Sequence, residues 1–215
     1  MKKYLFILTS IVVSLQLSAQ DDVNEILDRL SKKMASYKCF YFEYTIKTED
    51  IQLKTSELQY GKVLTKGKKF RLSTKDVYLY SNGETQWQYL KPENEVVIST
   101  VDANSDDFFI NPIGFITGDR KNFKQRLKNE VIEDGINLTE IDFYPRDLKT
   151  PYAYIRVRIN EKKQMPYSIK YVGKDGVHYT IKINNSSTDI EMPDDSEFVF
   201  EPSKYQNITV VDLRE

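Results

Sequence analysis

The sequence is poor in the residues that usually carry catalysis. Its 215 residues include a single histidine, His178, and a single cysteine, Cys39. A nucleophile and a base that converge need more candidates than these two side chains supply, and His178 has no second His or Cys at ligand spacing. No G-x-S-x-G, H-E-x-x-H or P-loop motif occurs. We therefore expect a protein that is not an enzyme, and a Cys39 that acts as a small hydrophobic residue.

Metal ligands in a recognisable spacing are lacking as well. The stretch Asp102-x-Asn104-x-Asp106 begins like a calcium loop. However, Asp107 replaces the glycine that such a loop requires, and Ile113 stands where the bidentate glutamate belongs. Neither a metal nor a cofactor is expected.

A charge excess of one sign is also missing. The chain has 31 basic and 32 acidic side chains, with a net charge of −1. Proteins that bind nucleic acid usually carry a clear basic excess, so this balance indicates no nucleic-acid partner.

Long apolar runs are confined to the first residues. Lys2 and Lys3 precede an apolar run over residues 5–17 that several polar residues interrupt, and small residues follow it. This pattern is typical of a cleaved secretory signal, and the run is too short and too interrupted for a membrane anchor. We interpret residues 1–19 as a signal peptide and expect the mature chain to begin at Gln20, in the periplasm.

The mature chain is expected to be unmodified by lipid and to form one domain. An exported lipoprotein needs a cysteine directly after its signal, whereas Cys39 lies well beyond Gln20. One cysteine cannot form an internal disulfide, so the core must hold the fold together. No repeat and no Pro/Gly/Ser-rich linker divides residues 20–215, which predicts a single domain. We also expect the protein to be a monomer.

The periodicity of apolar residues changes once, near Lys38. A helix is predicted over residues 22–37, because apolar residues recur there at steps of three and four. These residues are Val23, Ile26, Leu27, Leu30 and Met34. After Lys38, apolar and polar residues alternate, which is typical of a strand with one face toward an apolar interior.

Strand patterns then fill most of the chain. They cover residues 56–65, 69–73, 77–81, 85–90, 95–99, 127–133, 138–144, 152–159, 165–172 and 177–184, with a final pair around Phe198 and Val210. Hairpin-like turns separate them, the clearest being Asn82-Gly83. About a dozen antiparallel strands cannot form a flat sheet, because strand twist accumulates until the sheet curls or splits.

A curled sheet of this size leaves a hollow unless something fills it. Large aromatic rings on alternating strand positions can line such a hollow. The alternative is that the same rings fill the core of a closed sandwich. The helix and the apolar stretch 111–117, which contains proline and glycine, are the expected covers.

Several stretches together resemble one known family. The run SNGETQWQYLKPENEVVI at Ser81–Ile98 is similar to its pattern of Asn-Gly, Trp, Tyr and a Pro-containing turn. Gly61–Leu72 resembles the preceding hairpin, Asn111–Ile116 falls at the lid segment, and Gly173–Ile183 with the C-terminal tail resembles the closing strands. The whole mature chain thus resembles the outer-membrane lipoprotein carrier family, the LolA-like proteins.

The resemblance implies a mainly β fold with some helix. That fold is an unclosed, strongly curved antiparallel β-barrel of about eleven or twelve strands, with a helical lid over a hydrophobic cavity. It further implies a periplasmic carrier that binds the acyl chains of lipoproteins and shuttles them from the inner to the outer membrane. The implied partners are acylated lipoproteins and the inner-membrane ABC lipoprotein-release complex, with an outer-membrane acceptor as a further candidate.

Eleven residues are expected to line the cavity and its lid. They are Leu30, Phe40, Phe42, Tyr44, Phe70, Leu72, Trp87, Tyr89, Ile113, Phe115 and Ile116. The resemblance also implies an arginine that holds the lid closed, in the hairpin before the Phe-rich strand. This chain departs from that pattern, because the corresponding turn contains Lys66. The alternative function is a periplasmic sensor of mislocalised lipoproteins, or a carrier of another lipid, on the same fold.

Overall fold

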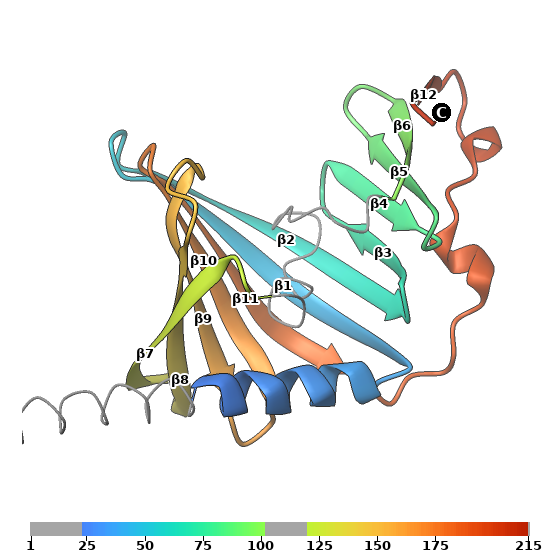
Figure 1. Ribbon diagram of the computed structural model, residues 1–215. Helices are drawn as coiled ribbons and strands as arrows, with labels where there is room; N and C mark the ends of the chain where they lie inside the picture. Colours follow the sequence, from blue (N-terminus) through green and yellow to red (C-terminus); the bar gives the residue numbers. More distant parts are fainter. Residues whose placement is uncertain (1–22, 102–119, 215) are drawn as a thin grey trace, which may run out of the picture. The chain divides into compact units, whose positions relative to one another are not determined.

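The computed structural model describes residues 23–101 and 120–214 (Figure 1). Within these residues the chain forms one helix over residues 23–36, twelve strands and two short 3-10 helices. The helix confirms the prediction for residues 22–37, and the strands confirm a mainly β protein.

The twelve strands follow one another with short connections. Their bounds are β1 (Cys39–Asp50), β2 (Thr55–Lys66), β3 (Lys69–Ser73), β4 (Val77–Ser81), β5 (Thr85–Leu90), β6 (Glu95–Thr100), β7 (Phe123–Glu133), β8 (Ile136–Pro145), β9 (Tyr152–Asn160), β10 (Met165–Gly173), β11 (Val177–Ser187) and β12 (Thr209–Asp212). The 3-10 helices are η1 (Asp195–Phe198) and η2 (Pro202–Lys204).

The strands form one hydrogen-bonded sheet with an open order. That order is β12-β6-β5-β4-β3-β2-β1-β11-β10-β9-β8-β7. The twelve strands and the open order confirm the prediction of an unclosed sheet of eleven or twelve strands.

Two details at the C-terminal end correct the sequence analysis. β12 pairs with β6 in parallel, with Val210 opposite Val96, so the sheet is not wholly antiparallel. The strand expected around Phe198 is instead the 3-10 helix η1, because the Asp194 carboxylate accepts a hydrogen bond from the backbone N–H of Ser196 and begins a helical turn there. Both features depend on contacts that local periodicity does not encode.

The described chain packs as two compact units. The first unit contains the helix, the β1–β2 connection and the strands β7 to β10, within residues 23–36, 49–55 and 120–180. The second unit contains most of β1 and β2, the strands β3 to β6 and the C-terminal segment, within residues 37–48, 56–101 and 181–214. The single domain expected for residues 20–215 stays a prediction.

The core of the first unit joins one face of the helix to one face of the sheet. The predicted helical stripe is buried at Val23, Leu27, Leu30 and Met34. In the strands, Val157 lies opposite both Ile141 of β8 and Ile169 of β10, and all three are buried. Every second residue of each strand therefore points into the core, as expected for a sheet with one apolar face.

A row of ion pairs lies between β8 and β9 in the same unit. The register places Asp142 opposite Arg156 and Glu140 opposite Arg158. Arg156 donates to both Asp142 oxygens, at 2.7 and 2.9 Å, and Arg158 donates to Glu140 at 3.0 Å. Because the Asp142 carboxylate is buried and accepts two hydrogen bonds from it, the pKa of Arg156 is raised above its ordinary value.

Candidate functional site

Three aromatic side chains form a continuous row along β1 in the second unit. Phe40 and Phe42 are stacked with ring centres 5.8 Å apart, and the Phe42 and Tyr44 rings lie 5.9 Å apart. Side chains two positions apart in a strand share a face, which explains the row. Phe42 and Tyr44 are buried and Phe40 is half-buried.

The row continues across β2, β3 and β4. A Cβ placed on Gly61 would overlap the Tyr44 ring, so Tyr44 covers Gly61 on the face that Gly61 shares with Val63. The register then carries this face from Val63 to Leu72 of β3 and from Leu72 to Leu79 of β4. We call this surface the Phe42 face. Its members are Phe40, Phe42, Tyr44, Val63, Phe70, Leu72 and Leu79.

The Phe42 face is chemically suited to hydrocarbon. Burial raises the pKa of Tyr44 to about 12, because a charged phenolate would lose its hydration there. Phe70 and Leu72 are only half-buried, so apolar area remains accessible beside the buried residues. The Phe42 face therefore offers mainly apolar contacts, and apolar contacts are what an acyl chain requires.

We expect Gly61→Ala to destabilise the protein by about 1–3 kcal/mol, because the new methyl group must displace the Tyr44 ring. Urea unfolding of the wild type and the variant measures the change. The control is the pair Tyr44→Ala and Tyr44→Ala/Gly61→Ala. The same Gly61 substitution should cost clearly less once the ring is gone, and an equal cost in both backgrounds would contradict the proposed overlap.

Trp87 and Tyr89 lie on the opposite side of the sheet. They pair across strands with Tyr80 and Tyr78 of β4, which alternate with Leu79 and so point away from the Phe42 face. The structure thus does not bring Trp87 and Tyr89 together with the other predicted cavity residues. The strand period alone could not reveal this, because the face depends on the register between hairpins.

Trp87 and Tyr89 instead form a core beneath the C-terminal segment. The buried cluster contains Trp87, Tyr89, Val96, Ile98 and Phe200. The Tyr89 ring centre lies 5.2 Å from that of Phe200 and 4.6 Å from that of Tyr205. Aromatic residues from two distant parts of the chain therefore hold the C-terminal segment on this side, which we call the Trp87 face.

Ion pairs hold the same segment at its start. Lys66 Nζ lies 2.8 Å from both the Pro193 carbonyl oxygen and Asp195 Oδ1, and Lys69 Nζ lies 2.6 Å from Asp195 Oδ2. Arg71 pairs with Glu197. Lys66 thus binds the C-terminal segment.

We expect Lys66→Ala/Lys69→Ala to raise the pKa of Asp195 from about 2 toward the ordinary aspartate value of about 3.9. Hydrogen bonds from the two ammonium groups hold that pKa down, so their stabilising effect is present above the ordinary value and is lost as pH falls through about 2. A carbon-13 NMR titration of the carboxyl groups measures it. Asp212 is the internal control, because its pKa of about 2 depends on Arg214 and should not move.

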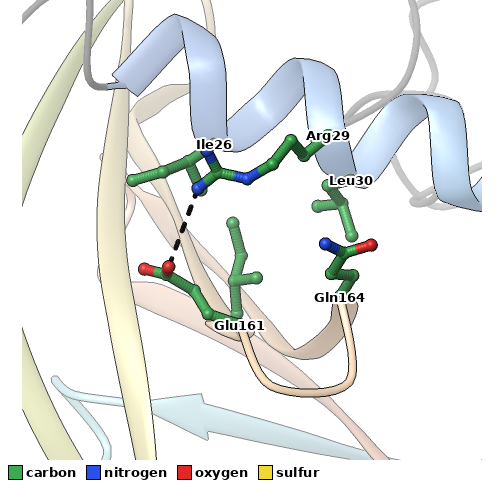
Figure 2. Close-up of a pocket in the computed structure, with 6 residues that line it drawn as sticks. Ile26, Arg29, Leu30, Glu161 and Gln164 are labelled. Carbon is green, nitrogen blue, oxygen red and sulfur yellow. Dashed lines mark ion pairs between the residues drawn. The ribbon is translucent and has the colours of Figure 1, made fainter.

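A second candidate region lies in the first unit, at Leu30. Figure 2 shows a small hollow between the helix and the β9–β10 turn, with Leu30 and Ile26 above and Glu161 and Gln164 below. Arg29 bridges its rim, with Nη2 3.8 Å from Glu161 Oε2. Leu30 is 1% exposed, so it contributes mainly to the core of this unit.

A larger hollow of about 330 Å³ adjoins the first one along β7 and β8. Its lining is mixed, with Ile26 and Leu127 beside charged residues such as Glu25, Lys128 and Glu130. Such a lining suits a polar molecule or solvent better than a hydrocarbon chain, so the Phe42 face remains the stronger candidate for an acyl ligand.

The predicted lid residues Ile113, Phe115 and Ile116 lie outside the described residues. Over residues 23–101 and 120–214, no cluster of three or more His, Cys, Asp or Glu side chains is arranged to bind a metal ion. In the same ranges, no helix combines the length and the apolar character needed to cross a bilayer.

Known proteins resemble this chain in sequence or in structure. An uncharacterized protein of Methanocaldococcus jannaschii is 24% identical over 204 residues, which cover 93% of this chain and 58% of that protein. A crystal structure of an uncharacterized conserved protein from Thermus thermophilus is 16% identical with a TM-score of 0.59, and the match covers 89% of this chain and 99% of that one. This likeness concerns the fold alone.

The family is identified by a sequence profile. The profile of the family described as "Outer membrane lipoprotein carrier protein LolA" matches residues 20–139, more than half of the chain. The chain therefore belongs to the LolA family of outer membrane lipoprotein carrier proteins.

Proposed function

We propose that this protein is a periplasmic carrier that binds the acyl chains of lipoproteins and shuttles the lipoproteins from the inner to the outer membrane. The observation that carries the proposal is the Phe42 face, a continuous apolar surface that crosses four adjacent strands. Membership of the family supports the same function.

The physical need for such a surface is large. Each methylene group of an acyl chain costs about 0.8 kcal/mol when it is exposed to water, so two or three chains cost tens of kcal/mol in total. A carrier must bury that area for a time and then release it. Half-buried residues such as Phe70 and Leu72 suit this task, because they can gain contacts with a ligand without opening a packed core.

The geometry supports part of the proposed set of ligand-binding residues. Phe40, Phe42, Tyr44, Phe70 and Leu72 share the Phe42 face, which supports a role for them in binding acyl chains. Leu30, Ile113, Phe115 and Ile116 remain proposed as cavity and lid residues on the basis of the family resemblance. Trp87 and Tyr89 are assigned to the core under the C-terminal segment and are not proposed as ligand contacts.

The same proposal covers location and partners. Residues 1–19 act as the signal peptide, and the mature monomer works in the periplasm without catalysing a reaction. It receives acylated lipoproteins from the inner-membrane ABC release complex, and an outer-membrane acceptor takes them over.

Lipid extraction tests the proposal directly. The mature chain, residues 20–215, is purified from the periplasm without detergent, extracted with chloroform and methanol, and analysed by mass spectrometry together with the intact complex. Lipoproteins with two or three acyl chains are the expected cargo. Polyprenyl lipids or glycolipids would favour a carrier of another lipid, and a chain that binds no lipid and releases no lipoprotein from spheroplasts would contradict the carrier function.

A further inference from the structure

One end of the first unit gathers three connections between strands. They are residues 51–54 between β1 and β2, residues 146–151 between β8 and β9, and residues 174–176 between β10 and β11. Figure 1 shows these turns together, the blue hairpin beside the two orange ones. We call this end of the unit the tip surface.

Hydrogen bonds tie the three turns to one another. Ile51 N donates to the Gly176 carbonyl oxygen at 3.0 Å, and Lys174 N donates to the Pro151 carbonyl oxygen at 2.9 Å. Lys174 Nζ also reaches the Leu148 carbonyl oxygen at 2.6 Å. The tip surface is therefore one connected structure, although its turns come from distant parts of the chain.

Large aliphatic side chains project from this structure into solvent. Leu148 is 81% exposed, Leu53 is 73% exposed and Ile51 is 55% exposed. Single exposed aliphatic side chains are common on protein surfaces, but three of this size on turns that hydrogen bonds connect call for an explanation.

The local backbone holds two of these side chains outward. Asp50 Oδ1 accepts hydrogen bonds from the backbone N–H groups of Gln52 and Leu53, and Lys54 follows with a φ of 55°. In the second turn Asp147 Oδ1 accepts from Lys149 N at 2.8 Å. These turns are fixed by side-chain caps, so the leucines cannot easily fold back onto the sheet.

The tip surface carries a basic excess, with Lys54, Arg146, Lys149 and Lys174 against Asp147 and Asp175, and this excess suits an anionic surface. Each protruding leucine is followed directly by an exposed lysine, in Leu53-Lys54 and Leu148-Lys149. The carboxylates Asp50 and Asp147 accept hydrogen bonds from backbone N–H groups within their own turns. The tip surface thus combines protruding aliphatic groups with a net positive charge, as in proteins that bind membrane interfaces.

We propose that the tip surface docks on anionic lipid bilayers, with Leu53 and Leu148 inserted among the headgroups and Lys54 and Lys149 beside the lipid phosphates. A bilayer fits convex turns better than a protein partner does, because lipids adapt to separate protruding side chains whereas a protein must offer matching pockets. This docking does not depend on what the Phe42 face carries.

Vesicle flotation tests the docking. The mature chain is mixed with protein-free vesicles of phosphatidylethanolamine and phosphatidylglycerol, or of phosphatidylcholine alone. The wild type is expected to float with the anionic vesicles. Leu53→Asp/Leu148→Asp is expected to bind them at least about tenfold more weakly, since a carboxylate in the interface opposes both insertion and the lipid charge. Lys54→Glu/Lys149→Glu should weaken binding to the anionic vesicles specifically.

Ile132→Asp is the matched control. Ile132 is 76% exposed and belongs to the same unit, but it lies next to the β7–β8 turn, at the other end of β8 from Leu148. This variant should float like the wild type. Equal losses in the control and in the leucine variant, or a wild type that binds only membranes containing other proteins, would overturn the proposal. Circular dichroism and urea unfolding verify that each variant is folded, and lipid extraction reports on the carrier function separately.

Discussion

Asp142→Ala is expected to lower the free energy of unfolding by about 3 kcal/mol, which urea unfolding of the mature chain measures. Asp142 is fully buried, and its carboxylate accepts hydrogen bonds from Arg156 and from the Tyr144 hydroxyl group, the latter at 3.0 Å. Removing the carboxylate leaves the half-buried guanidinium group of Arg156 without its closest partner and dependent on Glu140, 3.3 Å away, and this loss of hydrogen bonds and charge compensation carries most of the cost.

The matched control for this prediction is Asp212→Ala. Asp212 also pairs with an arginine, Arg214, at 2.6 Å, but both side chains are 43% exposed. Water can solvate the arginine that remains, so losing this ion pair should lower the free energy of unfolding by at most about 1 kcal/mol. If the two variants were destabilised by the same amount, burial would not be what makes the pair between β8 and β9 important.

Leu72→Asp is expected to reduce lipoprotein release from spheroplasts by at least about tenfold. Leu72 lies on the Phe42 face and is half-buried, so the strand can tolerate a carboxylate there while the acyl chain cannot. Placing a charge against hydrocarbon costs several kcal/mol, and each 1.4 kcal/mol is a factor of about ten in affinity. The measured quantities are the released lipoprotein and the lipid that copurifies with the variant.

Ser73→Asp supplies the comparison for Leu72→Asp. Ser73 is the next residue of β3, is also half-buried, and lies opposite Tyr78 on the Trp87 side of the sheet. The same carboxylate should therefore leave release close to the wild-type level. Normal release by Leu72→Asp, with the fold intact, would remove the Phe42 face from the binding site.

Local patterns in the sequence predicted most of the fold. The helix follows from apolar residues at steps of three and four, and four of the five expected positions are buried. The Asn82-Gly83 turn appears as expected: the Asn82 side chain accepts hydrogen bonds from Glu84 N and Thr85 N, and Gly83 has a φ of 94°. These features depend on residues close together in the chain, so one sequence suffices to predict them.

Features that depend on distant partners were missed. The sequence pattern places Tyr78 and Trp87 in strands. However, only the pairing of β4 with β5 and the packing of Phe200 against this side show which face the C-terminal segment covers. The Asp142–Arg156 pair is hidden in the same way, because acids and bases alternate along many exposed strands. Counting outward from Asn82-Gly83 would place Trp87 opposite Tyr78, whereas the strands pair Trp87 with Tyr80, because the two-residue loop is Gly83-Glu84.

The parallel strand β12 has a consequence for solubility. A free strand edge offers unpaired N–H and C=O groups that recruit strands from other molecules and so start aggregation. β12 occupies that position beside β6, yet it is only four residues long and ends in Asp212, which Arg214 holds in an ion pair. A short, charged end strand is a poor template for further pairing, so β12 protects this edge of the sheet from recruiting further strands.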